Sequence, residues 1–388
     1  MERLTKQLSQ NVKQYAMYVA LFVIIIFFEI TTKGVLLQPQ NVTNLILQNS
    51  YVLVLAIGMM FVIITGYVDL SVGSIVAIVG AVAGYLTVQL KMDAIPTILI
   101  VLVAGVLIGM FHGLFIAYLR IPPFITTLAG MLLFRGLTMV ILNGRTMAPF
   151  PKLYENISNG YIPDLFGGTS GLNILTLVLT ALLIVLMAFS VLRKRAQLQK
   201  YDIQQNGWGV DIIKIVIAAL LIGFVGYSLA AYKGVPNVLI LIAALFVIYN
   251  FIAERTVIGR RVYALGGNEK AARLSGIKTK WMMFVVYTNM GLLAAIAGIV
   301  FSARLNAATP KAGNGFELDA IAACFIGGAS AAGGVGTVMG AIIGALVMGV
   351  INNGMSILGI GIDWQQAIKG CVLLGAVAFD VLSKQQKE

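Results

Sequence analysis

Long apolar runs repeat along this 388-residue sequence and constrain its fold more than any other feature. A helix needs about 20 residues to cross about 30 Å of hydrocarbon, and twelve runs approach that length. Hydrophobic residues make up 59% of the chain and charged residues 11%, against roughly 45–50% and 25% in soluble domains. The sequence therefore predicts an all-α, polytopic helical membrane protein with 10–12 spans, in which residues 1–388 form one transmembrane domain.

The predicted spans cover residues 15–30, 45–67, 72–90, 95–119, 124–142, 172–192, 212–231, 235–253, 281–301, 318–332, 335–355 and 365–382. The run at 318–332 is short and begins next to Asp319. It is expected to be either a tilted helix or a re-entrant half-helix packed inside protein.

Positive charge predicts the orientation of these spans. Segment 254–280 carries two acidic residues, Glu254 and Glu269, and seven basic ones, which are Arg255, Arg260, Arg261, Lys270, Arg273, Lys278 and Lys280. The positive-inside rule places this segment in the cytoplasm. With both termini also inside, 18 of the 27 Lys and Arg residues are cytoplasmic and 7 are outside. Residues 1–14 and 193–211 are then cytoplasmic, and the long loop 143–171 is extracytoplasmic.

A short surface helix is predicted within this basic segment. Asn268 can cap a helix that begins at Glu269, with Arg273 at the favourable i,i+4 distance. Gly266 and Gly267 before the helix and Gly276 after it are expected to break the chain. The segment either only sets the topology or displays a docking helix for a soluble partner.

Glycines recur at helical spacing in both halves of the chain. One set is Gly105, Gly109 and Gly113, and the other is Gly336, Gly340 and Gly344. Each set is expected to line one helix face, where a neighbouring backbone can approach closely and slide. Asp69 and Asp319 precede or open the glycine-rich regions of the two halves, which suggests an inverted repeat.

Few ionisable residues fall within the spans, and each has a structural interpretation as well as a functional one. Asp69 can cap the third span together with Ser71, Arg135 can snorkel or pair, and the single histidine, His112, can be a packing residue. Lys369 is expected to pair with Asp363 or Asp380. No chain of carboxylates crosses the membrane, which argues against proton coupling.

Polar groups in the spans are candidates for lining a solute path, because amides both donate and accept hydrogen bonds. The candidates are Gln48, Asn49, Asp69, Thr126, Thr127, Asn289, Asn352 and Asn353. Each could instead make a helix-to-helix hydrogen bond. No catalytic or metal-binding residues are predicted, and Cys324 and Cys371 are expected in packing roles. No Gly-Lys dipeptide occurs, so the sequence holds no phosphate-binding loop, and any ATPase must be a separate chain.

Four segments in order resemble a known family. They read GYVDLSVGS, RIPPFITTLAGMLLFRG, IGRRVYALGGNEKAARLSGI and ELDAIAACFIGGASAAGGVGTVMGAIIGA. They look like the membrane permease subunit of bacterial ABC importers for monosaccharides, in the ribose, xylose and galactose branch. The resemblance covers about residues 41–382. The extra pair of spans around 193–253 is most like the xylose or multiple-sugar permeases.

The resemblance implies a transporter subunit in the bacterial inner membrane that is not itself an enzyme. Its expected partners are a second copy of itself, a cytoplasmic ABC ATPase that binds ATP and Mg, an extracytoplasmic sugar-binding protein, the sugar and membrane lipid. The chain itself is expected to hold no cofactor and to bind no nucleic acid. The pattern EAAxxxG of permease coupling helices is matched with Lys270 inserted, and the distal Ile-x-Leu-Pro is absent. The residues implied in coupling are Arg260, Arg261, Asn268, Glu269, Ala271, Ala272, Arg273 and Gly276.

Two rival functions fit a polytopic membrane chain. A stand-alone secondary sugar transporter would move its solute without any ATPase. A membrane scaffold or receptor would move no solute at all.

Overall fold

The computed structural model describes residues 2–167, 171–201 and 207–385, and within these ranges the side chains of residues 17–378 and 380–382. Within these ranges every regular element is a helix, and strand pairing is limited to two isolated bridges. The elements are α1 (Glu2–Thr31), α2 (Pro39–Ile64), α3 (Val72–Gly84), the π-helix η1 (Tyr85–Gln89), α4 (Ala94–Ala117), α5 (Pro123–Leu142), α6 (Lys152–Asn159), α7 (Ile174–Lys200), α8 (Trp208–Ala230), α9 (Asn237–Arg255), α10 (Val257–Gly267), α11 (Glu269–Leu274), α12 (Thr279–Leu305), α13 (Phe316–Ile326), α14 (Val338–Ile357) and α15 (Ile362–Gln385).

Ten helical segments of the described chain are long and apolar enough to cross a membrane. They confirm the predicted class, an all-helical polytopic membrane protein. The upper count of twelve full spans is not reached among the described residues. In α1, the stretch whose side chains are described, Met17–Thr31, is apolar but shorter than these ten. Helix α13 has 11 residues, which extend about 16 Å, or about half of the hydrocarbon thickness. A full crossing by α13 is therefore excluded, and the predicted half-helix is the alternative that fits.

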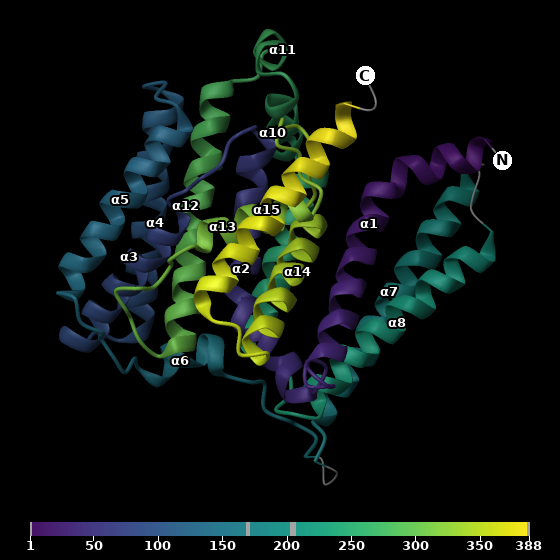
Figure 1. Ribbon diagram of the computed structural model, residues 1–388, viewed down its shortest axis with the longest axis horizontal. Helices are drawn as coiled ribbons and strands as arrows, with labels where there is room; N and C mark the ends of the chain where they lie inside the picture. Colours follow the sequence, from purple (N-terminus) through teal and green to yellow (C-terminus); the bar gives the residue numbers. More distant parts are fainter. Residues whose placement is uncertain (1, 168–170, 202–206, 386–388) are drawn as a thin grey trace.

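The helices run between two distinct ends of the molecule (Figure 1). One end, called here the α11 end, carries α10 and α11, and the described ends of α1 and α15 lie on the same side. The opposite end, called here the α6 end, carries the short helix α6. The first residues of α1 and the last residues of α15 thus lie on one side, as an even number of crossings requires.

Helix α2 forms the centre of the fold. Its sequence is apolar on every side, and 89% of its most apolar stretch is buried. It packs against α12, α14, α13, α9 and α8. By contrast, only 6% of the corresponding stretch is buried in α7 and in α15. An all-round apolar helix can be either central or lipid-facing, so the surrounding helices decide which position it takes.

The loop at 306–315 turns back into the body of the protein before α13 begins. It meets the α6 end at Ala308, which pairs with Met147 close to Gly84. Further on, the backbone of Gly313 touches that of Gly73, which lies 11 residues before Gly84 on α3, or about 16 Å deeper. Arg135 of α5 donates to the carbonyl oxygens of Ala312 (2.5 Å) and Gly313 (3.2 Å). A protein side chain therefore supplies the hydrogen-bond donor for both of these loop carbonyls.

The glycine sets lie at close helix crossings, with one exception. A Cβ atom at Gly105 would lie 2.8 Å from the carbonyl oxygen of Gly291, and one at Gly109 would lie 2.6 Å from that of Tyr287, both on α12. Gly344 faces the Ala323 carbonyl of α13 in the same way. The prediction for Gly336 was wrong, because α14 begins two residues later at Val338 and Gly336 belongs to the preceding loop.

Candidate functional site

The predicted surface helix is present at the α11 end. Helix α11 begins at Glu269, and the side chain of Asn268 accepts a hydrogen bond from the Ala271 amide at 3.0 Å, which confirms the predicted cap. Gly276 has a φ of +83°, the left-handed conformation that ends the turn after α11. Glu269 and Arg273 form no ion pair in the part of the chain that the structure describes. Both are solvent-exposed, and exposed pairs gain little from holding one geometry.

Helix α10 was missed by the sequence interpretation. Gly266 and Gly267 form its last turn and do not break the chain, which breaks instead at Asn268. The signal was present in the sequence, because the buried residues Gly259, Val262 and Leu265 follow one another at three-residue spacing. Thr256 starts the helix, and its hydroxyl accepts the Gly259 amide at 3.2 Å.

Helix α10 docks directly on the end of the central helix α2. A Cβ atom at Gly266 would lie 1.6 Å from the carbonyl oxygen of Ile64, so only glycine allows this approach. The same carbonyl accepts the Gly334 amide at 2.8 Å. α10, the end of α2 and the loop between α13 and α14 therefore meet at one point.

Tyr263 adds a directional bond to this junction. Its hydroxyl donates to the Gly336 carbonyl at 2.7 Å. Burial raises the pKa of Tyr263, and the charge of Glu254 raises it further. The hydroxyl therefore stays protonated at neutral pH and keeps its proton for this bond.

A basic pocket of about 650 Å³ lies beside α11. Its walls come from the turn between α4 and α5, from α11 and from the start of α12. The charged lining consists of one acid, Glu269, and four bases, which are Arg120, Arg273, Lys278 and Lys280. The excess of positive charge suits an acidic surface or segment of a partner.

Seven of the eight residues implied in coupling are exposed at this end. They are Arg260, Arg261, Asn268, Glu269, Ala271, Arg273 and Gly276. Ala272 is 5% exposed and packs inward. The site is therefore an exposed polar surface with one apolar contact beneath it.

The amide side chains predicted along a path fall into separate groups. Asn353 of α14 donates to Gln48 of α2 at 3.2 Å and exchanges hydrogen bonds with Asn41. Asn49 donates to the Leu45 carbonyl of its own helix at 2.8 Å. The Asn352 side-chain oxygen is buried without a hydrogen-bond partner. The structure thus brings Gln48 and Asn353 together and shows helix-to-helix bonding for that pair.

The remaining polar candidates lie elsewhere. Asn289 accepts a hydrogen bond from Tyr249 at 2.5 Å, which joins α12 to α9. Thr126 and Thr127 donate to carbonyls of Pro122 and Pro123 in the first turn of α5. These three side chains therefore do not share a site with Gln48 and Asn353.

Asp69 orders the turn before α3 instead of capping that helix. Its Oδ1 atom accepts from the amide (2.9 Å) and the hydroxyl (2.5 Å) of Ser71, and no side chain caps α3 itself. The Ser71 hydroxyl also lies 3.4 Å from Nδ1 of His112, which is 1% exposed. The capping prediction for Asp69 was wrong because the residue lies two positions before Ser71, which occupies the N-cap position of α3.

The partner predicted for Lys369 was also wrong. Its Nζ atom lies 3.0 Å from Oδ1 of Asp319, which is 2% exposed. Asp363 and Asp380 are six and eleven residues away on the same helix, outside the i±3 and i±4 positions that meet side by side. The ion pair instead fastens α15 to the half-helix α13.

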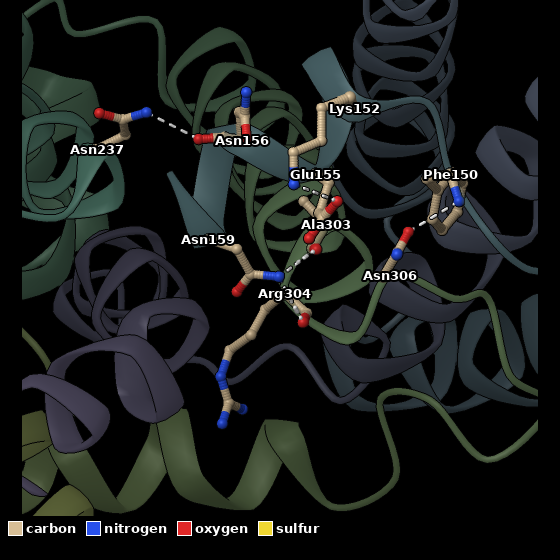
Figure 2. A network of polar contacts seen from close by, with 9 residues as sticks. All are labelled: Phe150, Lys152, Glu155, Asn156, Asn159, Asn237, Ala303, Arg304 and Asn306. Carbon is tan, nitrogen blue, oxygen red and sulfur yellow. Dashed lines mark hydrogen bonds and ion pairs between the residues drawn. The ribbon is translucent and has the colours of Figure 1, made fainter. Parts of the chain in front are cut away.

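The loop at 143–167 is tied firmly to the α6 end (Figure 2). Asn159 of α6 donates to the carbonyl oxygens of Ala303 (3.2 Å) and Arg304 (3.0 Å) at the end of α12. The Phe150 amide donates to Asn306 at 2.8 Å, and Asn237 donates to the Asn156 carbonyl at 2.8 Å. Residues 168–170 of the predicted loop, and 202–206 of the predicted linker at 193–211, lie outside the described residues.

Comparison with known proteins gives a consistent result. The sequence profile of the branched-chain amino acid transport system / permease component family matches residues 41–195 and 203–377. The xylose transport system permease protein of Escherichia coli (strain K12) is 40% identical over 380 residues, which are 97% of this chain and 94% of that protein. The corresponding protein of Haemophilus influenzae is 39% identical, over 97% and 98% of the two chains. The ribose import permease protein of Escherichia coli (strain K12) is 35% identical, over 88% and 85%. No solved structure gives a significant match.

Proposed function

The chain belongs to the branched-chain amino acid transport system / permease component family, and on that premise we propose that it is the permease of an ATP-driven, binding-protein-dependent importer of a monosaccharide. Xylose or a related pentose or hexose is the proposed substrate. The observation that carries this proposal is the 40% identity with a xylose permease over 97% of the chain. The chain supplies the path through the membrane, and hydrolysis of ATP takes place on another subunit.

The α11 end is the proposed cytoplasmic side, where an ABC ATPase docks. The eight residues Arg260, Arg261, Asn268, Glu269, Ala271, Ala272, Arg273 and Gly276 form the proposed coupling surface. Support comes from the exposure of seven of them and from the basic pocket beside α11. Movement of α11 would pass through α10 to the end of α2 and to the loop before α14, because all three meet at Gly266.

The α6 end is the proposed extracytoplasmic side. Loop 143–171 and the end of α12 would meet a sugar-binding protein there, and two copies of the chain would enclose one path.

In the finer topology that we propose, α1 and the return through α13 complete twelve membrane segments. The break at Asp69 and the half-helix at Asp319 would then be corresponding elements of an inverted repeat.

Reconstitution tests this function. The chain is placed in vesicles with or without a candidate ATPase and binding protein, and uptake of labelled xylose, ribose and glucose is measured with ATP. Uptake that requires all three proteins is the expected result. Uptake by this chain alone that collapses with a protonophore would identify a secondary transporter, and no uptake under any condition would favour a scaffold.

Two substitutions test the coupling surface within that system. Glu269→Lys and Gly276→Asp are expected to abolish sugar-stimulated ATP hydrolysis while the chain still inserts in the membrane. Lys200→Glu, an exposed charge reversal on α7, is the control and should leave the stimulation unchanged. If both coupling variants keep full stimulation, the assignment of α11 is wrong.

A further inference from the structure

The α7–α8 hairpin is attached to the rest of the protein at only one end. Helix α7 packs on α8, and α8 packs on α2. The buried residues of α8 are confined to its last turns, at Gly226, Ser228, Leu229 and Ala230. The buried residue recorded in α7 is Thr176, in the first turn of that helix. Both anchor points lie at the α6 end, and the pair leans away from α2 and α14 toward the α11 end (Figure 1).

This arrangement leaves apolar helix faces uncovered in the half of the membrane near the α11 end. Exposed apolar side chains there include Leu186 and Phe189 on α7, and Ile248 and Phe251 on α9. Each of these side chains lies one to three helical turns before the polar end of its helix. In a bilayer such faces need acyl chains or another helix as cover.

A basic pocket of about 500 Å³ lies where these two helices end. Its lining consists of Ser190, Arg193, Lys194, Gln197 and Leu198 of α7, Tyr201 directly after that helix, and Arg255 of α9. The lining contains three cations and no acid. None of the three forms an ion pair in the described part of the chain. The neighbouring Arg195 has a different environment, because it pairs with Asp211 at 2.5 Å and stacks over Trp208.

The depth of the pocket matches the phosphate layer of a bilayer. The apolar part of α7 runs from Ile174 to Leu192, which is 19 residues, or about 28 Å of helix against about 30 Å of hydrocarbon. Arg193 is the first residue beyond it. Helix α9 also has 19 residues and ends at Arg255. The three cations therefore lie at the headgroup level of the leaflet on the α11 side.

We propose that this pocket binds the phosphate of an anionic phospholipid whose acyl chains cover the apolar faces of α7 and α9. Arginine donates to phosphate through two parallel N–H groups, and Lys194 adds a third positive charge. Ser190, Gln197 and Tyr201 supply neutral hydrogen-bonding groups for the rest of the headgroup. A zwitterionic lipid carries its own cation and gains less from a pocket with three positive charges. This inference rests on the membrane location of the chain and not on the transported solute.

Native mass spectrometry of the purified full chain tests the site. The protein is offered phosphatidylglycerol and phosphatidylcholine with the same acyl chains at equal concentration, and the retained lipid is quantified. Retention of phosphatidylglycerol over phosphatidylcholine is expected. In Arg193→Gln/Arg255→Gln that preference should fall about 25-fold, because the variant removes two cations and each cation near an anionic headgroup contributes about a fivefold preference.

Two matched variants separate a built site from general surface charge. Lys200→Gln/Lys214→Gln removes the same charge from the same end of the molecule, outside the pocket, and should keep the preference. Arg193→Lys/Arg255→Lys keeps the charge and should retain most of it. Size-exclusion chromatography shows that each variant is folded. An equal loss in both Gln variants would overturn the proposal.

Competition separates a lipid from a free anion. Inorganic phosphate at millimolar concentration should not displace phosphatidylglycerol, because it lacks the acyl chains. Displacement by phosphate alone would identify a soluble-anion site and contradict the proposal. The proposal would also be contradicted if a second copy of the chain covers the apolar faces of α7 and α9. That arrangement would be detected as a cross-link between Cys residues introduced at Leu186 of one copy and Ile248 of the other.

Discussion

The two ends of α12 are held in different ways. At the α6 end, its last carbonyls accept hydrogen bonds from Asn159, and the hydroxyls of Tyr154 and Ser302 lie 2.9 Å apart. At the α11 end, no side-chain hydrogen bond joins α11 to α12 among the described residues. There the connection to the core passes through α10, by the close approach at Gly266 and the Tyr263 bond.

This difference indicates which end can transmit a movement. Several hydrogen bonds hold the α6 end together as one unit. A movement of α12 relative to α6 would require several of these bonds to break at once. The α11 end depends on packing against glycine, and packed backbones can shift against each other without losing many bonds. An external partner that moves α11 would therefore shift α10 and the end of α2 while the α6 end stays in place.

The largest expected effect comes from Gly266→Val. The new side chain would overlap the Ile64 carbonyl and force α10 away from α2, at a cost of about 1–3 kcal/mol or more. We expect ATP-driven uptake in the reconstituted system to fall at least tenfold, while purification yield stays measurable. Gly267→Ala is the matched control, since a Cβ atom there meets nothing within 4 Å. If the two variants transport equally well, the close packing of α10 on α2 does not transmit movement from the α11 end.

A smaller effect is expected from Asn159→Ala at the other end. The change removes two hydrogen bonds to α12, each of which contributes about 0.5–1.5 kcal/mol. The apparent midpoint of thermal unfolding in detergent should fall, and the transport rate per folded molecule should not. Lys152→Ala, at a side chain 77% exposed, should leave the midpoint unchanged. If Asn159→Ala keeps the unfolding midpoint but loses transport, the α6 end takes part in the transport movement and is not a fixed anchor.

The smallest effect is expected from Tyr263→Phe. It deletes one hydrogen bond, worth about 1 kcal/mol, and leaves the ring packed against the loop before α14. Uptake should fall a few fold, with little change in thermal stability. Because the pKa of Tyr263 is raised by burial and by Glu254, the wild-type bond should persist as the pH rises from 7 to 9. Tyr118→Phe provides the control, since that hydroxyl makes no hydrogen bond among the described residues.

Local patterns in the sequence were enough to predict the helical class, ten of the spans and the capped helix at Glu269. These features depend on residues close together in the chain. The partner of Lys369 could not be predicted this way, because Asp319 lies fifty residues earlier and meets it only through the packing of α15 on α13. Helix α10 was missed because its two glycines were interpreted as a break, whereas the space that they leave is filled by the backbone of α2.

The inward turn at 306–315 also bears on the order in which the protein assembles. Its carbonyls at Ala312 and Gly313 depend on Arg135, which is synthesised more than 170 residues earlier. The donor is therefore already made when its acceptors leave the ribosome. A circular permutation that exchanges the two halves would reverse this order of synthesis. The Ala312 and Gly313 carbonyls would then enter the bilayer before Arg135 is made, without their hydrogen-bond donor.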